Sequence, residues 1–377
     1  MHSLDELLHP ITPAHFYADY EDRKPLHIPA VNGSRKRDVL TWTAFNGLLN
    51  QSSIWTTHNL RLMRNYVAVP ADQYCQPVQT PGGLVMRPWP PKIEVFLSAG
   101  ASLIANDLLY AHVPFTHIGK VLGRVFAASI GANIYCSFQG VQAFGTHFDN
   151  HDVMVIQTEG EKVWNLYETR AANPVEPLAD DDTTRRWFAQ GRGPLMAEVR
   201  MKPGDVLYLP RGWYHDALAT DGASLHVTFA ITPLHGRNLV TSLDLEAIKD
   251  PAYRAFLPPA TERNGDALRE HLADMARLLA ATINSPAFFA EMAMAQERIT
   301  PRAPDFGLPQ RKPVTLYRTT GRAFPQVSPA VRATFDWAID ERQFALEDMV
   351  AEFEGLSEAA VRAGVAAAEA AGAVEKV

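Results

Sequence analysis

Short apolar segments separated by turn residues fill the first 240 residues, and they limit the fold more than any other feature. The clearest segments read LHIPAV, ANIYCSF, DVMVIQ, KVWNLY, DVLYLP and LHVTFAI. Runs of this length, rich in β-branched and aromatic residues and bounded by Pro and Gly, are typical of strands in a sandwich or barrel. The sequence therefore predicts a mainly β domain over residues 1–240.

The pattern becomes helical after that domain, in residues 241–305. Leu268, Leu272, Met275 and Leu279 recur every three or four positions, which places them on one face of a helix. An apolar stripe of this kind needs a partner surface, so we expect a homodimer that forms through this region.

Residues 306–377 form a third unit, and the Pro-rich run TPRAPDFGLPQRKP at 300–313, which overlaps its start, is interpreted as a linker. Ser328 and Ser357 are expected helix N-caps, and three short helices with a strand-like tail suggest a winged-helix-like domain. Residues 329–377 carry ten acidic and four basic side chains, a balance of −6. A helix that reads DNA needs the opposite sign, so we expect no direct DNA binding.

Composition narrows the class of protein. The 377 residues carry a formal net charge of −7, which disfavours sequence-independent binding to phosphate backbones. We find neither a signal-peptide pattern at the N-terminus nor an apolar run long enough to cross a bilayer. Two cysteines, Cys75 and Cys136, cannot build a disulfide framework. These features lead us to expect a soluble, cytoplasmic protein.

Three residues have the side chains and spacing of a metal site. His147 and Asp149 are two positions apart, so on a strand they would project from the same face. The run KPGDVLYLPRGWYHDA then presents His215 after a tight turn. Two histidines and one carboxylate form the facial triad of non-haem Fe(II) oxygenases.

Lys162 is the second unusual residue. It shares its expected strand face with Trp164 and Leu166, so it points inward if they do. A buried ammonium is costly unless it meets an anion, and one carboxylate of a bound dicarboxylate would supply that anion.

Each residue also has a simpler interpretation. A His-x-Asp pair on a strand is more often a structural or surface pair than a ligand set. A single histidine after an apolar strand is usually a polar residue with its hydrogen bonds satisfied. Only the combination with Lys162 favours a metal and an anion in one pocket.

Two runs resemble a known family. The segments NIYCSFQGVQAFGTHFDNHDVMVIQTEGEKVWNLYE and PGDVLYLPRGWYHDA are similar to the JmjC-type ribosomal oxygenases, the cupin-like protein hydroxylases. The opening ITPAHFYADYEDRKPLHIPA resembles their N-terminal segment, so the likeness covers residues 10–235 well.

The resemblance implies a fold and a set of roles. The fold would be a double-stranded β-helix (jelly-roll, JmjC/cupin), mostly β with some α, followed by a helical dimerisation region and a winged-helix-like domain. His147, Asp149 and His215 would bind Fe(II), and Lys162 would pair with the distal carboxylate of 2-oxoglutarate. Asn133 and Tyr135 match polar residues that line the co-substrate pocket, and Ser137 matches less well.

Some positions carry no role from the resemblance. The loop QGVQAFGT and His151 differ from what the family leads us to expect, and both lie where a substrate would approach. Trp213 and Tyr214 are expected to pack, and Arg211 is expected to be a solvated turn residue. Strand parity alone places His226 and Thr228 near the co-substrate.

The activity implied is Fe(II)- and 2-oxoglutarate-dependent hydroxylation of a side chain in a protein or peptide. The net charge of −7 suits a basic ribosomal protein as the partner. Two alternatives stay open: the same chemistry on a tRNA nucleoside, a small metabolite or a biosynthetic peptide, and a metal-binding cupin without catalysis. The acidic balance speaks against RNA, and the single His-x-Asp with Lys162 speaks against other cupins.

Overall fold

This computed structural model describes residues 2–377, apart from 139, 141, 177, 180, 220, 221, 303–313 and 354. The chain divides into two units, Met1–Ala303 and Pro304–Val377. The Pro-rich run that we interpret as a linker falls almost entirely outside the described residues.

Most strands belong to the first unit. Their bounds are β1 Leu26–Ile28, β2 Leu60–Arg64, β3 Val67–Ala68, β4 Cys75–Thr80, β5 Gly83–Pro88, β6 Ser102–Ala105, β7 Ala128–Ser137, β8 Asp152–Glu159, β9 Lys162–Arg170, β10 Leu195–Met201, β11 Val206–Leu209, β12 Trp213–Leu218 and β13 Ser224–Pro233. The predicted apolar segments correspond to β1, β7, β8, β9, β11 and β13.

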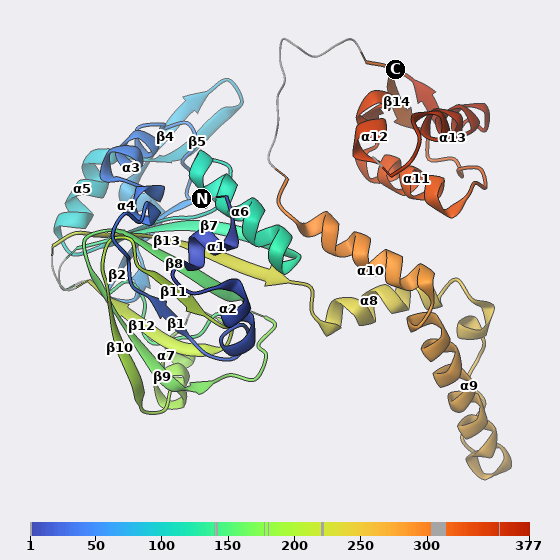
Figure 1. Cartoon of the computed structure of the whole chain (residues 1–377), viewed down its shortest axis with the longest axis horizontal. Coiled ribbons are helices and arrows are strands. Elements are labelled where there is room, and N and C mark those ends of the chain that lie inside the picture. Colours follow the sequence, from blue (N-terminus) through green and yellow to red (C-terminus); the bar gives the residue numbers. More distant parts are fainter. Residues whose placement is uncertain are drawn as a thin grey trace. The chain divides into compact units, whose positions relative to one another are not determined.

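Two sheets form the barrel. The larger one has the strand order β1-β11-β8-β13-β7-β6-β2-β3, and the smaller one has the order β10-β9-β12 (Figure 1). The pairings among the described parts of these strands are antiparallel, and β13 pairs with β7 over its full length. This architecture confirms the predicted jelly-roll.

Strand β8 shows that the larger sheet is buried on both of its faces. Met154 and Ile156 belong to the core on the outer face of that sheet, whereas Val153 and Val155 pack with Trp164 of the smaller sheet. Alternate residues point to opposite faces, so an apolar run without alternation means burial on both faces. Each buried Val or Ile contributes roughly 1.5–3 kcal/mol, which makes the strand a stable support for a site.

The first unit also contains helices, some of which pack on the outer face of the larger sheet. Their bounds in the first unit are α1 Leu4–Leu8, α2 Pro13–Asp19, α3 Trp42–Leu49, α4 Ala71–Tyr74, α5 Pro90–Ser98, α6 Val113–Phe126, α7 Asp182–Gly191, α8 Gly236–Ala247, α9 Asp266–Ile283 and α10 Pro286–Ile299. Helix α6 packs on β7 and β13 with Phe115, Ile118 and Leu122, spaced three or four positions apart and fully buried. Thr41 caps α3 by accepting a hydrogen bond from Ala44 N.

The helices α8 to α10, residues 236–299, form what we call the helical segment. Helix α9 contacts α8 and α10, and α10 contacts β7. The apolar stripe predicted from Leu268, Leu272, Met275 and Leu279 lies on α9. Leu272 of this stripe is 52% exposed, and Phe289 of α10 is 75% exposed. Within the first unit, the segment therefore carries apolar surface that no other described element of that unit covers.

The second unit has its own core. It contains α11 Pro329–Glu341, α12 Leu346–Glu352, α13 Glu358–Ala370 and a three-stranded sheet of β15 Gln343–Ala345, β14 Leu316–Thr319 and β16 Val374–Lys376. Phe335, Val361 and Val365 centre the core, and Ser357 caps α13 through Ala360 N. Helices and a small sheet agree with the outline that we expected, and winged-helix remains a prediction.

No single helix among the described residues has both the length and the apolar composition to cross a bilayer. One bent pair, Glu262–Ile283 with Pro286–Ile299, meets the two criteria jointly, with 59° between its halves.

Candidate active site

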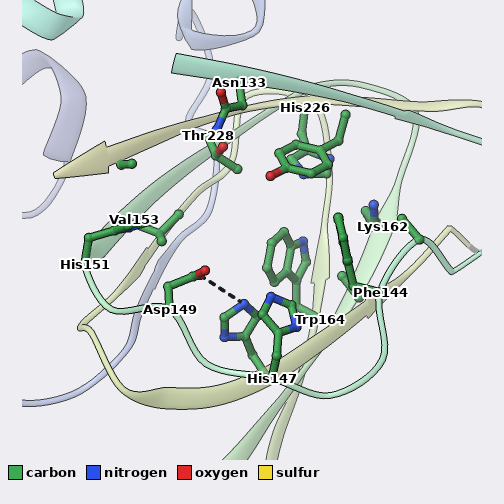
Figure 2. Close-up of a pocket in the computed structure, with 15 residues that line it drawn as sticks. Asn133, Phe144, His147, Asp149, His151, Val153, Lys162, Trp164, His226 and Thr228 are labelled. Atoms are coloured by element: carbon green, nitrogen blue, oxygen red, sulfur yellow. Dashed lines mark ion pairs between the residues drawn. The ribbon is translucent and has the colours of Figure 1, made fainter. Parts of the chain in front are cut away.

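A cavity of about 240 Å³ lies between the two sheets and gathers the residues singled out from the sequence. His147, Asp149, His215, Lys162, Asn133 and Tyr135 all line it. Figure 2 shows Asp149 and His147 together on one side of the cavity and Lys162 on the other, beyond Trp164. The same space therefore holds a set of metal-ligand side chains and a buried cation.

The three expected ligands converge. One ligand atom from each of His147, Asp149 and His215 lies within 4.8 Å of the others, and His215 Nε2 is 3.6 Å from Asp149 Oδ2. Burial and the neighbouring His147 lower the pKa of His215 to about 4. A neutral His215 keeps a lone pair for a metal at neutral pH. The donor set and its spacing fit the facial triad of Fe(II).

Backbone contacts orient both imidazoles. His147 Nδ1 lies 2.8 Å from Gly145 O, and His215 Nδ1 lies 2.9 Å from Trp213 O. A carbonyl can only accept, so each Nδ1 carries the hydrogen and each Nε2 keeps its lone pair. A metal-bound histidine commonly donates its other N–H in this way, which fixes the ring.

The backbone around the pair differs from the regular strand that we expected. His147 makes an isolated two-residue bridge with His215, with N–O distances of 3.0 and 2.8 Å, and Phe148 and Asp149 lie in the loop before β8. The ladder stops because β8 begins only at Asp152 and pairs with β11 and β13 instead. Phe148 still points away from the ligands and packs on Phe188 and Tyr214.

Lys162 is 3% exposed at the start of β9, and Trp164 and Leu166 on the same strand are also buried. Burial lowers the pKa of Lys162 to about 8. Among the described residues no carboxylate forms an ion pair with its ammonium. The positive end of the cavity is therefore ready for an anion.

Polar groups of β7 and β13 complete the wall. Tyr135 stacks on His226 with centroids 5.0 Å apart and planes 4° apart, and burial raises the pKa of Tyr135 to about 12. Asn133 Oδ1 accepts a hydrogen bond from Asp107 N. Thr228 also lines the cavity, so the strand-parity expectation for His226 and Thr228 agrees with their positions.

Two buried nitrogens in this wall have no partner. Trp164 Nε1 and His226 Nδ1 make no hydrogen bond to any described residue, although both side chains are at least nine-tenths buried. Burial, and then the nearby Lys162, hold the pKa of His226 well below its usual value. An unpaired buried donor costs about 1–3 kcal/mol, so these atoms indicate a polar ligand.

The residues without an assigned role have definite positions. His151 lines both this cavity and a second one of about 280 Å³, which Arg211 also lines. Arg211 N donates to Asp152, and Trp213 Nε1 donates to Tyr167 O, so both belong to the framework. His151 is therefore not simply a solvated loop residue.

Sequence reasoning missed two groups around the ligands. Phe144 and Ala143 line the cavity from the loop before His147. Thr146 and Asp216, which flank the two histidines, share a hydrogen bond of 2.8 Å. A polar residue beside each ligand was a visible signal, but nothing in the sequence pairs the two.

Comparison with known proteins places the barrel in a class. Residues 107–239 match the JmjC domain family. This match includes all the residues that line the cavity.

Within this class the predicted resemblance is confirmed. The chain is 32% identical over 229 residues to "Bifunctional lysine-specific demethylase and histidyl-hydroxylase NO66" of Aedes aegypti, which covers 60% of this chain and 34% of that protein. It is 27% identical over 227 residues to "Ribosomal oxygenase 1" of Danio rerio, covering 59% and 39%. The chain therefore spans only about a third of the length of these curated relatives.

Solved structures agree in fold. An X-ray structure of Escherichia coli YcfD matches with a TM-score of 0.52 and 16% identity over 97% of this chain and 98% of that one. A second structure of this E. coli ribosomal oxygenase, solved with cobalt and 2-oxoglutarate, matches with a TM-score of 0.50 and 16% identity over 96% and 97%. At this identity the likeness concerns the fold alone.

Proposed function

We propose that this chain is an Fe(II)- and 2-oxoglutarate-dependent dioxygenase that hydroxylates a side chain of a protein or peptide. One observation carries the proposal: a three-ligand metal set and a buried lysine without a carboxylate partner face the same cavity. The metal set alone would suit many cupins, and the lysine alone would suit many anions. Their combination suits a metal-binding dicarboxylate.

His147, Asp149 and His215 would hold the iron. Their Nε2 and Oδ atoms approach from one side, so a bound ion keeps its other positions open for ligands. When bound, the iron supplies the oxidative chemistry that couples decarboxylation of 2-oxoglutarate to hydroxylation of a C–H bond. The protein residues orient the reactants and keep water out of the cavity.

Lys162 would pair with the distal carboxylate of 2-oxoglutarate. A compact ammonium suits a single carboxylate end, and Tyr135 stays protonated as a donor because burial raises its pKa to about 12. Asn133 and Tyr135 would contact the co-substrate from β7. The structure of the E. coli relative with cobalt and 2-oxoglutarate supports this combination of metal and co-substrate.

The proposed substrate is a ribosomal protein. The names of the curated relatives include "Ribosomal oxygenase 1" and "histidyl-hydroxylase". A net charge of −7 favours encounter with basic polypeptides.

The assembly that we propose is a cytoplasmic homodimer. The domains would be the JmjC/cupin-like catalytic domain at 1–240, the helical dimerisation region at 241–305 and the winged-helix-like domain at 306–377. Exposed apolar side chains on the helical segment, such as Leu272 and Phe289, support the dimer. The balance of −6 in residues 329–377 speaks against direct DNA contact.

Mass spectrometry of ribosomal proteins tests the activity. Proteins from cells with and without the gene are compared for the gain of one oxygen on a single side chain, and the purified enzyme with Fe(II) and 2-oxoglutarate should restore it. A His147→Ala protein is the matched control. If no ribosomal protein gains oxygen although the enzyme turns 2-oxoglutarate into succinate, the substrate belongs to another class.

A further inference from the structure

A buried carboxylate follows ligand His215 directly in the chain. Asp216 is 6% exposed, and as the next residue of β12 it points away from the cavity that His215 faces. Its carboxylate accepts hydrogen bonds from Thr146 Oγ1 at 2.8 Å, Asn165 Nδ2 at 2.9 Å and Tyr167 OH at 2.6 Å. Three donors hold this anion in one orientation.

Arg192 completes the network from the segment after α7. Its Nη1 donates to Tyr167 OH at 2.8 Å and to Thr146 Oγ1 at 3.2 Å, and it lies 3.9 Å from Asp216 Oδ2. The guanidinium also sits 4.6 Å above the Tyr167 ring. A buried carboxylate without a cation is costly, so the nearby guanidinium of Arg192 lowers the free-energy cost of burying Asp216.

The network joins the two chain segments that carry the metal-binding histidines. Thr146 precedes His147 and Asp216 follows His215, although the pair is separated by 70 positions. The backbones of these segments meet at the isolated bridge between His147 and His215 and at one further hydrogen bond, from Gly212 N to Asp149 O at 2.8 Å. A bridge of two residues gives limited backbone support, so the side-chain network adds another connection between the two segments.

We propose that Asp216 is a positioning residue that fixes the separation and orientation of His147 and His215, and thereby sets the affinity of the site for its metal. The inference rests on the proposed function only in assuming that the triad binds a divalent ion. Outer residues that orient metal ligands typically contribute about 10- to 100-fold in metal affinity.

The first test is Asp216→Asn. The amide keeps the volume but turns an NH₂ group toward hydroxyls and amides that must donate. We expect the dissociation constant for Co(II), measured by calorimetry under anaerobic conditions, to rise roughly 10- to 100-fold. In the Co(II) protein, the paramagnetically shifted proton signals of the two ligand imidazole N–H groups should also move.

Asp205→Asn is the matched control. Asp205 is likewise buried, at 4% exposure, and accepts hydrogen bonds from Ala30 N, Lys202 N and His27. It does not line the cavity of the triad. This variant should lose stability to a similar degree, yet keep the wild-type Co(II) affinity and the imidazole N–H signals.

Thr146 provides an independent pair of variants. Thr146→Val removes the hydroxyl and should weaken Co(II) binding, whereas Thr146→Ser keeps it and should restore wild-type affinity. The Thr146 variants keep the proposal testable if Asp216→Asn does not fold.

The outcomes separate this inference from the proposed function. If the wild type binds Co(II) but Asp216→Asn or Thr146→Val binds it within twofold, the positioning role is wrong and the metal site stands. If Asp205→Asn loses as much affinity as Asp216→Asn, the effect is general destabilisation and the inference is again wrong. If the wild type itself binds no Co(II), the proposed function fails and takes this inference with it.

Discussion

The barrel and the helical segment depart from ordinary burial in opposite directions. Among the described residues of the barrel, the buried Lys162 has no carboxylate partner, and the buried His226 Nδ1 and Trp164 Nε1 have no hydrogen-bond partner. In the helical segment, Leu272 and Phe289 are apolar and more than half exposed. Buried polar groups normally have partners, and large exposed apolar patches are rare on monomers.

This difference indicates which kind of partner each region would bind. A polar group in a closed cavity can be satisfied only by something small enough to enter, so the barrel requires a ligand. An apolar helix face is covered by another surface, so the exposed side chains of the helical segment support the proposed dimer. Each interpretation can be tested by substituting the unusual side chains, which are buried polar groups in the barrel and exposed apolar residues in the helical segment.

The largest effect is expected at the triad. His147→Ala or Asp149→Ala should abolish succinate formation, because two ligands do not hold Fe(II) firmly. Thermal unfolding should show that the barrel stays folded. His15→Ala, at an exposed position of α2 that does not line the cavity, is the control and should keep full turnover. Near wild-type turnover of either triad variant with added iron would remove the metal assignment.

Lys162→Ala should have the next largest effect. Loss of one partner from a desolvated charge pair costs about 3–5 kcal/mol, which corresponds to roughly two to three decades in the KM for 2-oxoglutarate. Lys162→Arg should be milder, because it keeps the charge but needs different room.

The exposed Lys202 provides the matched control, and Lys202→Ala should leave this KM unchanged. Succinate release measured against 2-oxoglutarate concentration gives all four values. A KM within twofold of wild type in Lys162→Ala would show that the lysine is only structural. It would then no longer support the binding of a dicarboxylate in the barrel.

A smaller effect is expected from pH. Burial lowers the pKa of Lys162 to about 8, and only the ammonium form pairs with a carboxylate. Affinity for 2-oxoglutarate should therefore be full below this value and fall as pH rises through it, by roughly tenfold between pH 7 and pH 9. Calorimetry with the Co(II) protein measures this, and Lys162→Ala should show a flat profile. An equally steep fall in Lys162→Ala would assign the titration to another group.

The smallest effect on catalysis is expected in the helical segment. Leu272→Glu places a charge in the apolar stripe and should shift the protein from dimer to monomer in light scattering at micromolar concentration. Because Leu272 is 52% exposed, the stability of each chain should change by only a few tenths of a kcal/mol.

Arg269→Glu, at an exposed position of the same helix, separates the loss of apolar contact from a general effect of charge and should leave the dimer intact. A wild type that scatters as a monomer of 41.7 kDa would contradict the dimer.

Local chemistry was predictable from the sequence. The apolar segment DVMVIQ predicted a strand, which is β8, and Ser357 was expected to start a helix, which it caps through Ala360 N. Lys162 was expected to point inward from the parity of β9, and it does. Each inference uses residues that are neighbours along the chain.

Contacts between distant segments were not predictable. Parity placed His147 and Asp149 on one strand face, but it cannot tell where a ladder ends, and Asp149 lies in a loop. The bonds of Asp216 to Thr146 and Tyr167 cross between segments, so only the assembled sheets reveal them. The lining by Phe144 depends on the path of a loop, which follows from packing rather than from local preference.

The bridge between His147 and His215 also has a consequence for the order of folding. A contact between such distant positions forms late, because the loop between them must first be closed at an entropic cost. A chain still being synthesised presents His147 and Asp149 long before His215 can dock beside them. The three ligands of the proposed iron site would therefore come together only after β12 has joined the barrel, and a half-folded chain would offer an incomplete metal site.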